Sequence, residues 1–240
     1  MDKGAERETI MTIAERIDDV KSRIEKAAVL SGRNAEEVRL MGVSKFHGTE
    51  KVEAALKAGL SLFGENRVQE AEGKFPALRE KYVPELHMIG SLQRNKAKSA
   101  SALFDCVQSV DRDELVTTLG GIAAGRGTPL RVLLEMHTGE ESKSGYPDED
   151  ALCRAVELAL SFPGLALSGL MTMAPFTKNI QAIRKSFRTL VSARERLSVR
   201  FPEIQLSCLS MGMSNDFETA VEEGSTLVRI GTAIFGERSP

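Results

Sequence analysis

Residues 38–46 read VRLMGVSKF, a short apolar stretch that is rich in strand-forming residues and contains a lysine near its end. The pattern of residues 49–58 then predicts a helix, and Gly59 stands where a helix commonly ends. A strand of this length followed at once by a helix is the repeating unit of α/β proteins. The fold therefore depends on how often the chain repeats this unit.

Seven further stretches have the same character, and helical patterns separate them. Strands that alternate with helices pair in parallel through right-handed crossovers. Eight strand candidates in 240 residues match a (β/α)8 TIM-type barrel, an α/β fold, with an open doubly wound sheet as the competing architecture. The predicted strands lie at about residues 38–46, 60–64, 86–91, 106–109, 130–136, 165–173, 206–210 and 227–235.

The predicted N-terminal helix can cover the place on the barrel where an eighth helix would otherwise lie. Only residues 237–240 follow the last predicted strand, too few for an eighth helix. Residues 5–31 show the three- and four-residue spacing of apolar side chains that predicts a long amphipathic helix. We expect this extra N-terminal helix to pack on the barrel. Because no linker or low-complexity tract is found, residues 1–240 are predicted to be a single domain.

Composition excludes several classes of function. The net charge of −2 lacks the basic surplus of a nucleic-acid binder, and the absence of Trp leaves few rings to stack on bases. No stretch reaches the ~18 consecutive apolar residues of a membrane span. The three cysteines form no CxxC pair, which indicates reduced thiols in a cytoplasmic protein. No histidine pair has metal-ligand spacing, so we expect no metal.

Lys45 is the first candidate active-site residue, because the active site of a barrel lies at the carboxyl ends of its strands. It ends the first predicted strand after a mostly apolar run. Burial disfavours the charged ammonium and makes a lysine a nucleophile that can form a Schiff base. The alternative is a strand-end lysine whose amine reaches solvent along its apolar stem.

Small residues near the last two strands suggest an anion site. SMGMS at 210–214 precedes a predicted helix, and Gly231 and Thr232 lie one strand later. Backbone N–H groups in such loops bind anions. Barrels often bind phosphate with the loops after strands seven and eight. Ordinary helix capping by Ser214 or Asn215 is the alternative.

Arg229 lies inside the apolar run 227–235, and a buried arginine needs partners. We expect it either to pair with a carboxylate or to donate to a ring nitrogen of a bound heterocycle. Asn66, Asn95 and Gln93 lie near the ends of strands two and three and suit neutral hydrogen bonding to a polar ligand. Capping of the following helices explains the two asparagines almost as well.

Seven motifs in order resemble the pyridoxal phosphate homeostasis protein family, also described as YggS-like or proline-synthase co-transcribed proteins. The resemblance extends over about residues 8–236. The motifs are GVSK at 42–45, FGEN at 63–66, HMIGSLQRNK at 87–96, EESKSG at 140–145, GLMTM at 169–173, LSMGMSND at 209–216 and VRIGT at 228–232.

The resemblance implies a fold type III pyridoxal 5′-phosphate (PLP) barrel, similar to the N-terminal domain of alanine racemase. It implies that Lys45 holds PLP as an internal aldimine, that Arg229 faces the pyridine nitrogen and that Asn66 lies near the ring. The chain departs from the family at His137, where many relatives have asparagine. The remaining cofactor positions implied are Met88 and Ile89 on the strand lining the pocket, and Ser210, Met211, Gly231 and Thr232 around the phosphate.

The resemblance also implies a protein that maintains PLP supply without efficient catalysis, with PLP-dependent apo-enzymes as candidate recipients. We expect a monomer, because the chain ends at Pro240, before the second domain that completes an alanine racemase and its dimer. Only Tyr82 and Tyr146 could supply a racemase's tyrosine base. Two alternatives stay open: a slow PLP-dependent amino-acid racemase, and a PLP-free barrel enzyme that uses Lys45 on a phosphorylated substrate.

Overall fold

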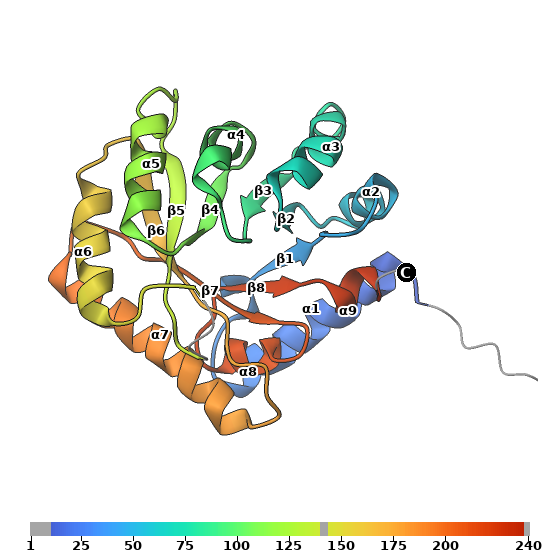
Figure 1. Cartoon of the computed structure of the whole chain (residues 1–240). Helices are drawn as coiled ribbons and strands as arrows, with labels where there is room; N and C mark the ends of the chain where they lie inside the picture. The colour runs from blue at the N-terminus through green and yellow to red at the C-terminus, as the bar shows by residue number, and fades with distance from the viewer. Residues whose placement is uncertain (1–10, 140–143, 238–240) are drawn as a thin grey trace, which may run out of the picture.

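Eight strands form a closed parallel barrel in the computed structural model, which describes residues 11–139 and 144–237. The strands follow one another around the barrel in chain order (Figure 1). They are β1 (Arg39–Val43), β2 (Leu62–Glu65), β3 (Glu85–Met88), β4 (Cys106–Val110), β5 (Leu130–Glu135), β6 (Leu165–Met171), β7 (Cys208–Met213) and β8 (Leu227–Ile230).

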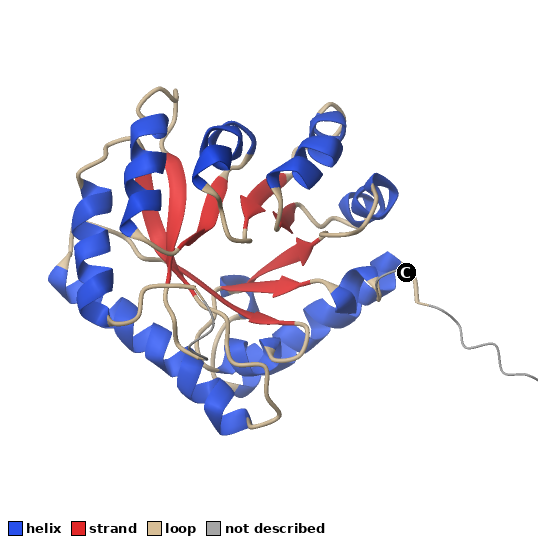
Figure 2. Cartoon of the chain, viewed as in Figure 1, coloured by secondary structure: helices blue, strands red, loops and turns tan. Residues whose placement is uncertain are grey.

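Helices surround the strands on the outside of the barrel (Figure 2). None of the helices in the described ranges has both the length and the apolar character needed to cross a membrane. The helices are α1 (Ile13–Leu30), α2 (Thr49–Lys57), α3 (Val68–Arg79), α4 (Ala97–Leu103), α5 (Asp113–Ala123), α6 (Glu149–Leu160), α7 (Ile180–Arg200), α8 (Phe217–Glu222) and α9 (Thr232–Phe235), with 3-10 turns at Ala35–Glu37 and Arg94–Lys96.

The pairing of the first strand with the last one decides between the two predicted architectures. Arg39 pairs with Leu227 and Met41 with Arg229, so β8 closes the sheet onto β1. An open doubly wound sheet would leave these two strands apart. The predicted (β/α)8 barrel is therefore confirmed, and the open sheet is excluded.

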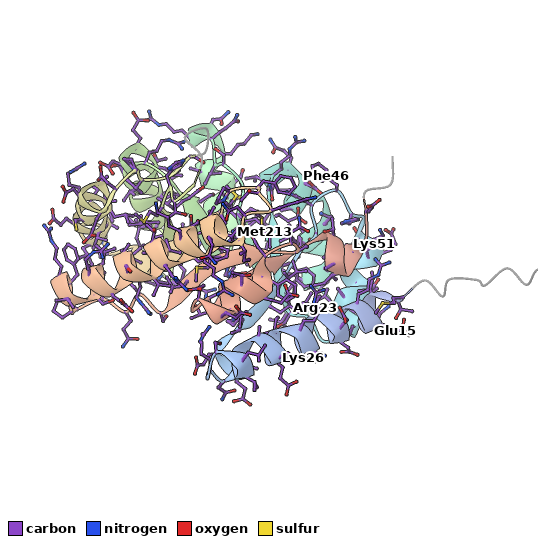
Figure 3. The ribbon with its side chains drawn as sticks, turned by 90° about the horizontal axis from the view of Figure 1, so that it is seen from below. Glu15, Arg23, Lys26, Phe46, Lys51 and Met213 are labelled. Atoms are coloured by element: carbon purple, nitrogen blue, oxygen red, sulfur yellow. The ribbon has the colours of Figure 1, made fainter. Side chains whose placement is uncertain are left out.

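Helix α1 packs against α2, α8 and α9, beside the place where β8 meets β1. It begins at Ile13 because Thr12 caps it, with Glu15 completing a capping box; predicted residues 5–10 lie outside the described ranges. The guanidinium of Arg23 ties α1 to α8: its Nε donates to Glu218 over 2.8 Å, and its Cζ lies 4.6 Å from the centre of the Phe217 ring. Figure 3 shows Arg23 between α1 and the body of the barrel.

The prediction of one long strand over residues 227–235 is wrong in its second half. The chain turns at Gly231, and Thr232–Phe235 form the short helix α9. Phe235 is buried because its ring packs over Gly42, where an added Cβ would lie 3.3 Å from the ring. A short apolar run therefore indicated burial here but not secondary structure.

Other strand ends differ from the prediction by a few residues. β3 ends at Met88 and not at residue 91, and β7 begins and ends later than the predicted 206–210. The polar loop 137–147 closes through a bridge between Met136 and Tyr146. Its residues 140–143, which carry most of the predicted EESKSG motif, lie outside the described ranges.

The interior of the barrel contains two apolar clusters as well as polar side chains. Met41, Leu62 and Leu227 form one cluster, and Cys106, Leu133 and Met171 form the other. Since side chains alternate along a strand, residues two positions away from these also point inward. This alternation places Arg229 and Ser210 inside the barrel, next to Leu227 and Cys208 in their strands.

Gly169 allows β6 and β7 to approach closely. A Cβ at this position would lie 1.9 Å from the carbonyl oxygen of Cys208, so Gly169→Ala must displace backbone. We expect this change to lower the free energy of unfolding by roughly 2 kcal/mol, measured by urea denaturation. The control is Gly73→Ala on exposed α3, where a Cβ meets nothing within 4 Å; it should raise that free energy by about 0.5–1 kcal/mol. Equal urea midpoints for the two variants would contradict this packing.

Candidate functional site

Lys45 follows β1 at the carboxyl end of the barrel. The strand alternation continues past Val43, because the Ser44 N–H still donates to the carbonyl of Gly64 over 3.2 Å. Ser44 faces the surrounding helices, so the next side chain, Lys45, turns toward the barrel mouth. Lys45 is half-buried. This is the position and the partial burial that a lysine nucleophile at this site requires.

The turn that carries Lys45 is held from outside by α3. The buried Nζ of Lys74 donates to the carbonyl oxygens of Ser44, over 2.9 Å, and His47, over 3.2 Å. Glu70 accepts a hydrogen bond from the backbone N–H of Phe46. Phe46 needs this support because its φ of 66° lies in the left-handed region, which is costly for a residue other than glycine.

Glu65 completes this cluster at the end of β2. Its Oε1 lies 2.6 Å from the Nζ of Lys74 and accepts the hydroxyl hydrogen of Ser44 over 2.6 Å. Burial raises the pKa of the Glu65 carboxyl, although Lys74 and Ser44 favour the charged form. Because breaking a buried ion pair is costly, the cluster fixes the backbone on both sides of Lys45.

Arg229 on β8 is buried and held by neutral oxygens. Its Nη1 lies 2.7 Å from both the carbonyl oxygen and the hydroxyl of Ser210, and its Nη2 lies 2.8 Å from the carbonyl oxygen of Thr172. Burial lowers the pKa of Arg229, while Asp216 and Glu135 oppose that effect. No ion pair joins Arg229 to a carboxylate within the described part of the chain, so the salt-bridge alternative is not supported.

The two small-residue loops lie side by side. Met213 pairs with Arg229 in the sheet, and the backbone N–H of Ala233 reaches the Ser214 hydroxyl at 3.4 Å. Gly212 lies near the end of β7, where the pairing with β8 is irregular. Its φ is 96° and an added Cβ would lie 2.6 Å from the Ala220 side chain, so only glycine fits there. Because β8 neighbours β1, the loop after β8 borders the strand that precedes Lys45, and the loop after β7 lies one strand further away.

The other predicted residues occupy different surroundings. Ile89 packs on the apolar cluster inside the barrel, whereas Met88 and Met211 are buried in the core between barrel and helices. Asn66 is half-buried next to Gly90, where an added Cβ would lie 2.4 Å from the Asn66 carbonyl oxygen. Asn66 and Ile89 therefore approach the mouth with Lys45 and Arg229, while two methionine side chains point away from it.

Glu135 was not predicted as a site residue. It is the last residue of β5 and is buried. Burial, followed by the charge of Asp111, raises the pKa of Glu135 to about 7, against the influence of Arg229. The sequence feature that could have indicated Glu135 is a single carboxylate near the end of the apolar stretch 130–136. The active sites of such barrels lie at the carboxyl ends of the strands.

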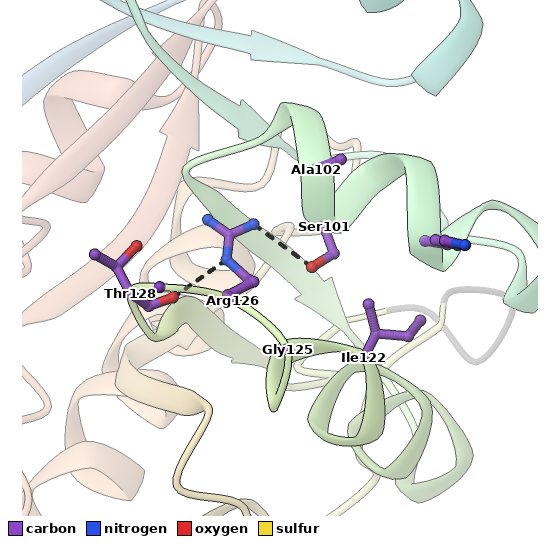
Figure 4. A pocket seen from close by; sticks show the side chains of 8 residues that line it. Ser101, Ala102, Ile122, Gly125, Arg126 and Thr128 are labelled. Carbon is purple, nitrogen blue, oxygen red and sulfur yellow. Dashed lines mark hydrogen bonds between the residues drawn. The ribbon is translucent and has the colours of Figure 1, made fainter.

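A separate depression lies between α4 and α5 on the outside of the barrel (Figure 4). Its arginine, Arg126, already donates to the Thr128 carbonyl oxygen over 3.3 Å and to the Ser101 hydroxyl over 3.5 Å. None of the predicted site residues lines it. Among the described residues, no group of three or more histidine, cysteine or acidic side chains is arranged to hold a metal ion.

Comparison with known proteins agrees with this geometry. The family described as "Alanine racemase, N-terminal domain" matches residues 16–239. A protein of Aquifex aeolicus (strain VF5), named "Pyridoxal phosphate homeostasis protein", is 38% identical over 228 residues, which cover 95% of this chain and 99% of that protein. PipY of Synechococcus elongatus PCC7942, solved with PLP bound, has a TM-score of 0.83 at 32% identity and covers 94% of this chain and 100% of its own.

An alanine racemase of Clostridium difficile 630 shares the fold, with a TM-score of 0.70 at 12% identity over 92% of this chain and 56% of that one. The family match over residues 16–239 includes every site residue from Lys45 to Thr232. Relatives with high identity also extend over nearly the whole chain. The chain therefore belongs to the family of pyridoxal phosphate homeostasis proteins.

Proposed function

We propose that this protein binds PLP and takes part in PLP homeostasis, with Lys45 holding the cofactor as a Schiff base. The observation that carries the proposal is the juxtaposition of Lys45 at the end of β1 with buried Arg229 on the neighbouring β8. Met41 on β1 pairs with Arg229 on β8, and Lys45 comes four residues after Met41, toward the mouth of the barrel. The name of the Aquifex relative and the PLP bound to PipY support the same function.

The donor set fits PLP chemically. An amine can bond to the aldehyde, and a guanidinium can donate only to an unprotonated ring nitrogen. Such a nitrogen makes the bound cofactor a weaker electron sink than a protonated one would be. Within the described residues, Arg229 donates its hydrogen bonds to neutral oxygens of Ser210 and Thr172, and the carboxylates of Asp216 and Glu135 act on its charge without pairing with it. This arrangement suits holding PLP better than reactions that need a strongly stabilised carbanion.

We assign the phosphate to the loops after β7 and β8. Gly231 and Thr232 would bind it from the β8 side. Ser210 and Met211 lie inside β7, the Ser210 hydroxyl is committed to Arg229 and the Met211 side chain is buried, so we propose that these two residues contribute by positioning the loop that follows β7.

The positions around the ring complete the proposed site. Asn66 suits a hydrogen bond to a polar group of the ring, and Ile89 would line its apolar side. The Met88 side chain is buried behind the strand, so we assign it the support of this wall of the pocket.

The arrangement of the tyrosines supports a carrier. The Tyr82 hydroxyl donates to Glu53 on α2 over 3.1 Å, and the Tyr146 hydroxyl donates to Asp113 on α5 over 3.0 Å. Neither tyrosine is directed at Lys45 as a second base. We propose that the protein acts as a monomer in the cytoplasm, in keeping with its three free thiols, and supplies PLP-dependent apo-enzymes.

Borohydride reduction of the PLP-loaded protein should attach the cofactor irreversibly to Lys45. Peptide mapping by mass spectrometry is expected to find the label on the Lys45 peptide alone, because Lys45 follows β1, which pairs with the strand that carries Arg229. Lys45→Ala should lose both the label and the visible absorbance. Lys57→Ala, on the exposed face of α2, is the matched control and should retain both. A label on another lysine, or a visible band in Lys45→Ala, would refute the assignment.

Thr232→Asp should weaken PLP retention roughly tenfold or more, because a carboxylate beside the phosphate adds like-charge repulsion in a partly desolvated site. Retention is measured as the PLP remaining after dialysis. Thr117→Asp on exposed α5 adds the same charge far from the loops and should leave retention unchanged. Equal retention in the two variants would remove Thr232 from the phosphate site.

Glu135 is the observation that favours the alternative, a slow racemase, because a buried carboxyl with a pKa of about 7 is suited to proton transfer. Enantiopure alanine incubated with the PLP-loaded protein in deuterated water separates the two functions. The carrier predicts no sustained α-deuterium exchange, measured by proton NMR. Exchange that rises as pH passes through about 7, and is lost in both Lys45→Ala and Glu135→Gln, would replace the carrier with the racemase.

A further inference from the structure

A chain of four short hydrogen bonds runs through the barrel interior, starting at Arg229. Its Nη1 lies 2.7 Å from the Ser210 hydroxyl, which lies 2.6 Å from the Gln108 Oε1. The Gln108 Nε2 lies 2.7 Å from the His87 Nδ1, and the His87 Nε2 lies 2.7 Å from the Glu85 Oε1. Four of the five side chains are almost completely buried, and Glu85 is about half-buried at the far end of β3.

The donor and the acceptor of each hydrogen bond in this chain can be assigned by starting from Arg229. A guanidinium can only donate, so Ser210 uses its hydroxyl oxygen as the acceptor and has its hydrogen left to donate. That hydrogen meets the carbonyl oxygen of the Gln108 side chain. The amide nitrogen of Gln108 then faces His87, whose Nδ1 must accept.

The opposite end independently requires the same direction. Glu85 accepts hydrogen bonds from Arg131, over 2.6 Å, and from Arg39. Burial favours its neutral form, but hydrogen bonds from His87, Arg39 and Arg131 hold the pKa of Glu85 well below its usual range. An ionised carboxylate can only accept, so the His87 Nε2 carries the hydrogen and the neutral ring leaves Nδ1 as an acceptor.

We propose that Gln108 and His87 are positioning residues for Arg229, and that the hydrogen-bonded chain fixes the guanidinium most firmly while His87 is neutral with its hydrogen on Nε2. The inference rests on the proposed function, because Arg229 matters here as the partner of the PLP ring. It assigns a role to two buried residues that are not themselves part of the proposed site.

Protonation of His87 is incompatible with the chain. The Nδ1–H of an imidazolium would meet the Gln108 amide N–H, so the amide would have to turn around. Its nitrogen would then face Ser210, whose hydroxyl hydrogen would lose its acceptor. The restraint on Arg229 from the Ser210 hydroxyl would weaken, while its bonds to the carbonyl oxygens of Ser210 and Thr172 would remain.

The surroundings of His87 favour its neutral form. Burial lowers the pKa of His87, Glu85 on its own strand raises it, and Arg131 and Arg39 on β5 and β1 lower it. Gln108 faces it from β4. The thiols of Cys106 and Cys208 also lie inside this part of the barrel, and burial raises the pKa of both, so they are uncharged near neutral pH.

The pH dependence has a definite sign. The pKa of His87 lies below the value of about 6.5 for an unfolded histidine, so the unfolded chain binds more protons in the interval between them. The stability that neutral His87 contributes is complete above about pH 6.5 and falls as the pH decreases through that interval. Restraint of Arg229, and with it PLP retention, should fall over the same interval.

The first experiment uses the full-length protein without PLP, so that it tests the chain separately from the proposed function. Nitrogen-15 NMR of the histidine rings at pH 7.5 should show His87 with its hydrogen on Nε2, assigned with the variant His87→Gln. A His87 ring protonated on Nδ1, or a cationic ring at this pH, would overturn the proposal.

The second experiment records the visible spectrum and the retention of PLP between pH 5 and 8. Gln108→Met should shift the spectrum and lower retention roughly tenfold at pH 7.5, since the Ser210 hydroxyl loses the acceptor that orients it toward Arg229. His87→Gln keeps one donor and one acceptor without titrating, so its retention should change less with pH than that of the wild type. Gln69→Met on exposed α3 is the control for the glutamine change.

The outcomes distinguish the two hypotheses. If the wild type and Gln69→Met bind PLP and Gln108→Met matches them in spectrum, retention and pH profile, the positioning role is wrong while the proposed function stands. If the wild type binds no PLP, the proposed function fails, and the NMR result still decides whether the hydrogen-bonded chain exists.

Discussion

The burial of one guanidinium inside a closed barrel is the constraint on which the site depends. Arg229 cannot reach solvent from the middle of β8, so its donors must be satisfied by groups inside the barrel. The nearest strands provide them through the Ser210 hydroxyl and the Ser210 and Thr172 carbonyl oxygens. Because these acceptors are neutral, they do not cancel the positive charge of Arg229, which can attract a ligand at the mouth.

Lys45 is held by different means, from the outer side of the barrel. The Lys74 and Glu65 cluster fixes the backbone before and after Lys45 without touching the space in the mouth. The two proposed cofactor contacts thus rest on separate supports, one inside the barrel and one behind it. Alternation of side chains along β1 explains this division, since Ser44 faces the helices and Lys45 faces the mouth.

The strand–helix repeat and the charged residues of the apolar strands could be predicted from the sequence. The contacts between side chains on different strands could not. The barrel followed from strand–helix alternation, and Lys45 and Arg229 stood out as charges in apolar runs. The helix α9 was predicted as strand because Ile234 and Phe235 are buried in either conformation. Gln108 and His87 could not be connected from the sequence, because the strand register that brings them within 2.7 Å is set only when the barrel closes. Nothing in the sequence around Lys74 indicates that this side chain is buried against Glu65.

A crystal structure of the full chain with PLP tests the central claim most directly. We expect electron density that continues from the Nζ of Lys45 into the cofactor, with the Arg229 guanidinium within hydrogen-bond distance of the ring nitrogen and the phosphate at the loops after β7 and β8. Density joined to another lysine, or a ring nitrogen that faces a carboxylate in place of Arg229, would contradict it.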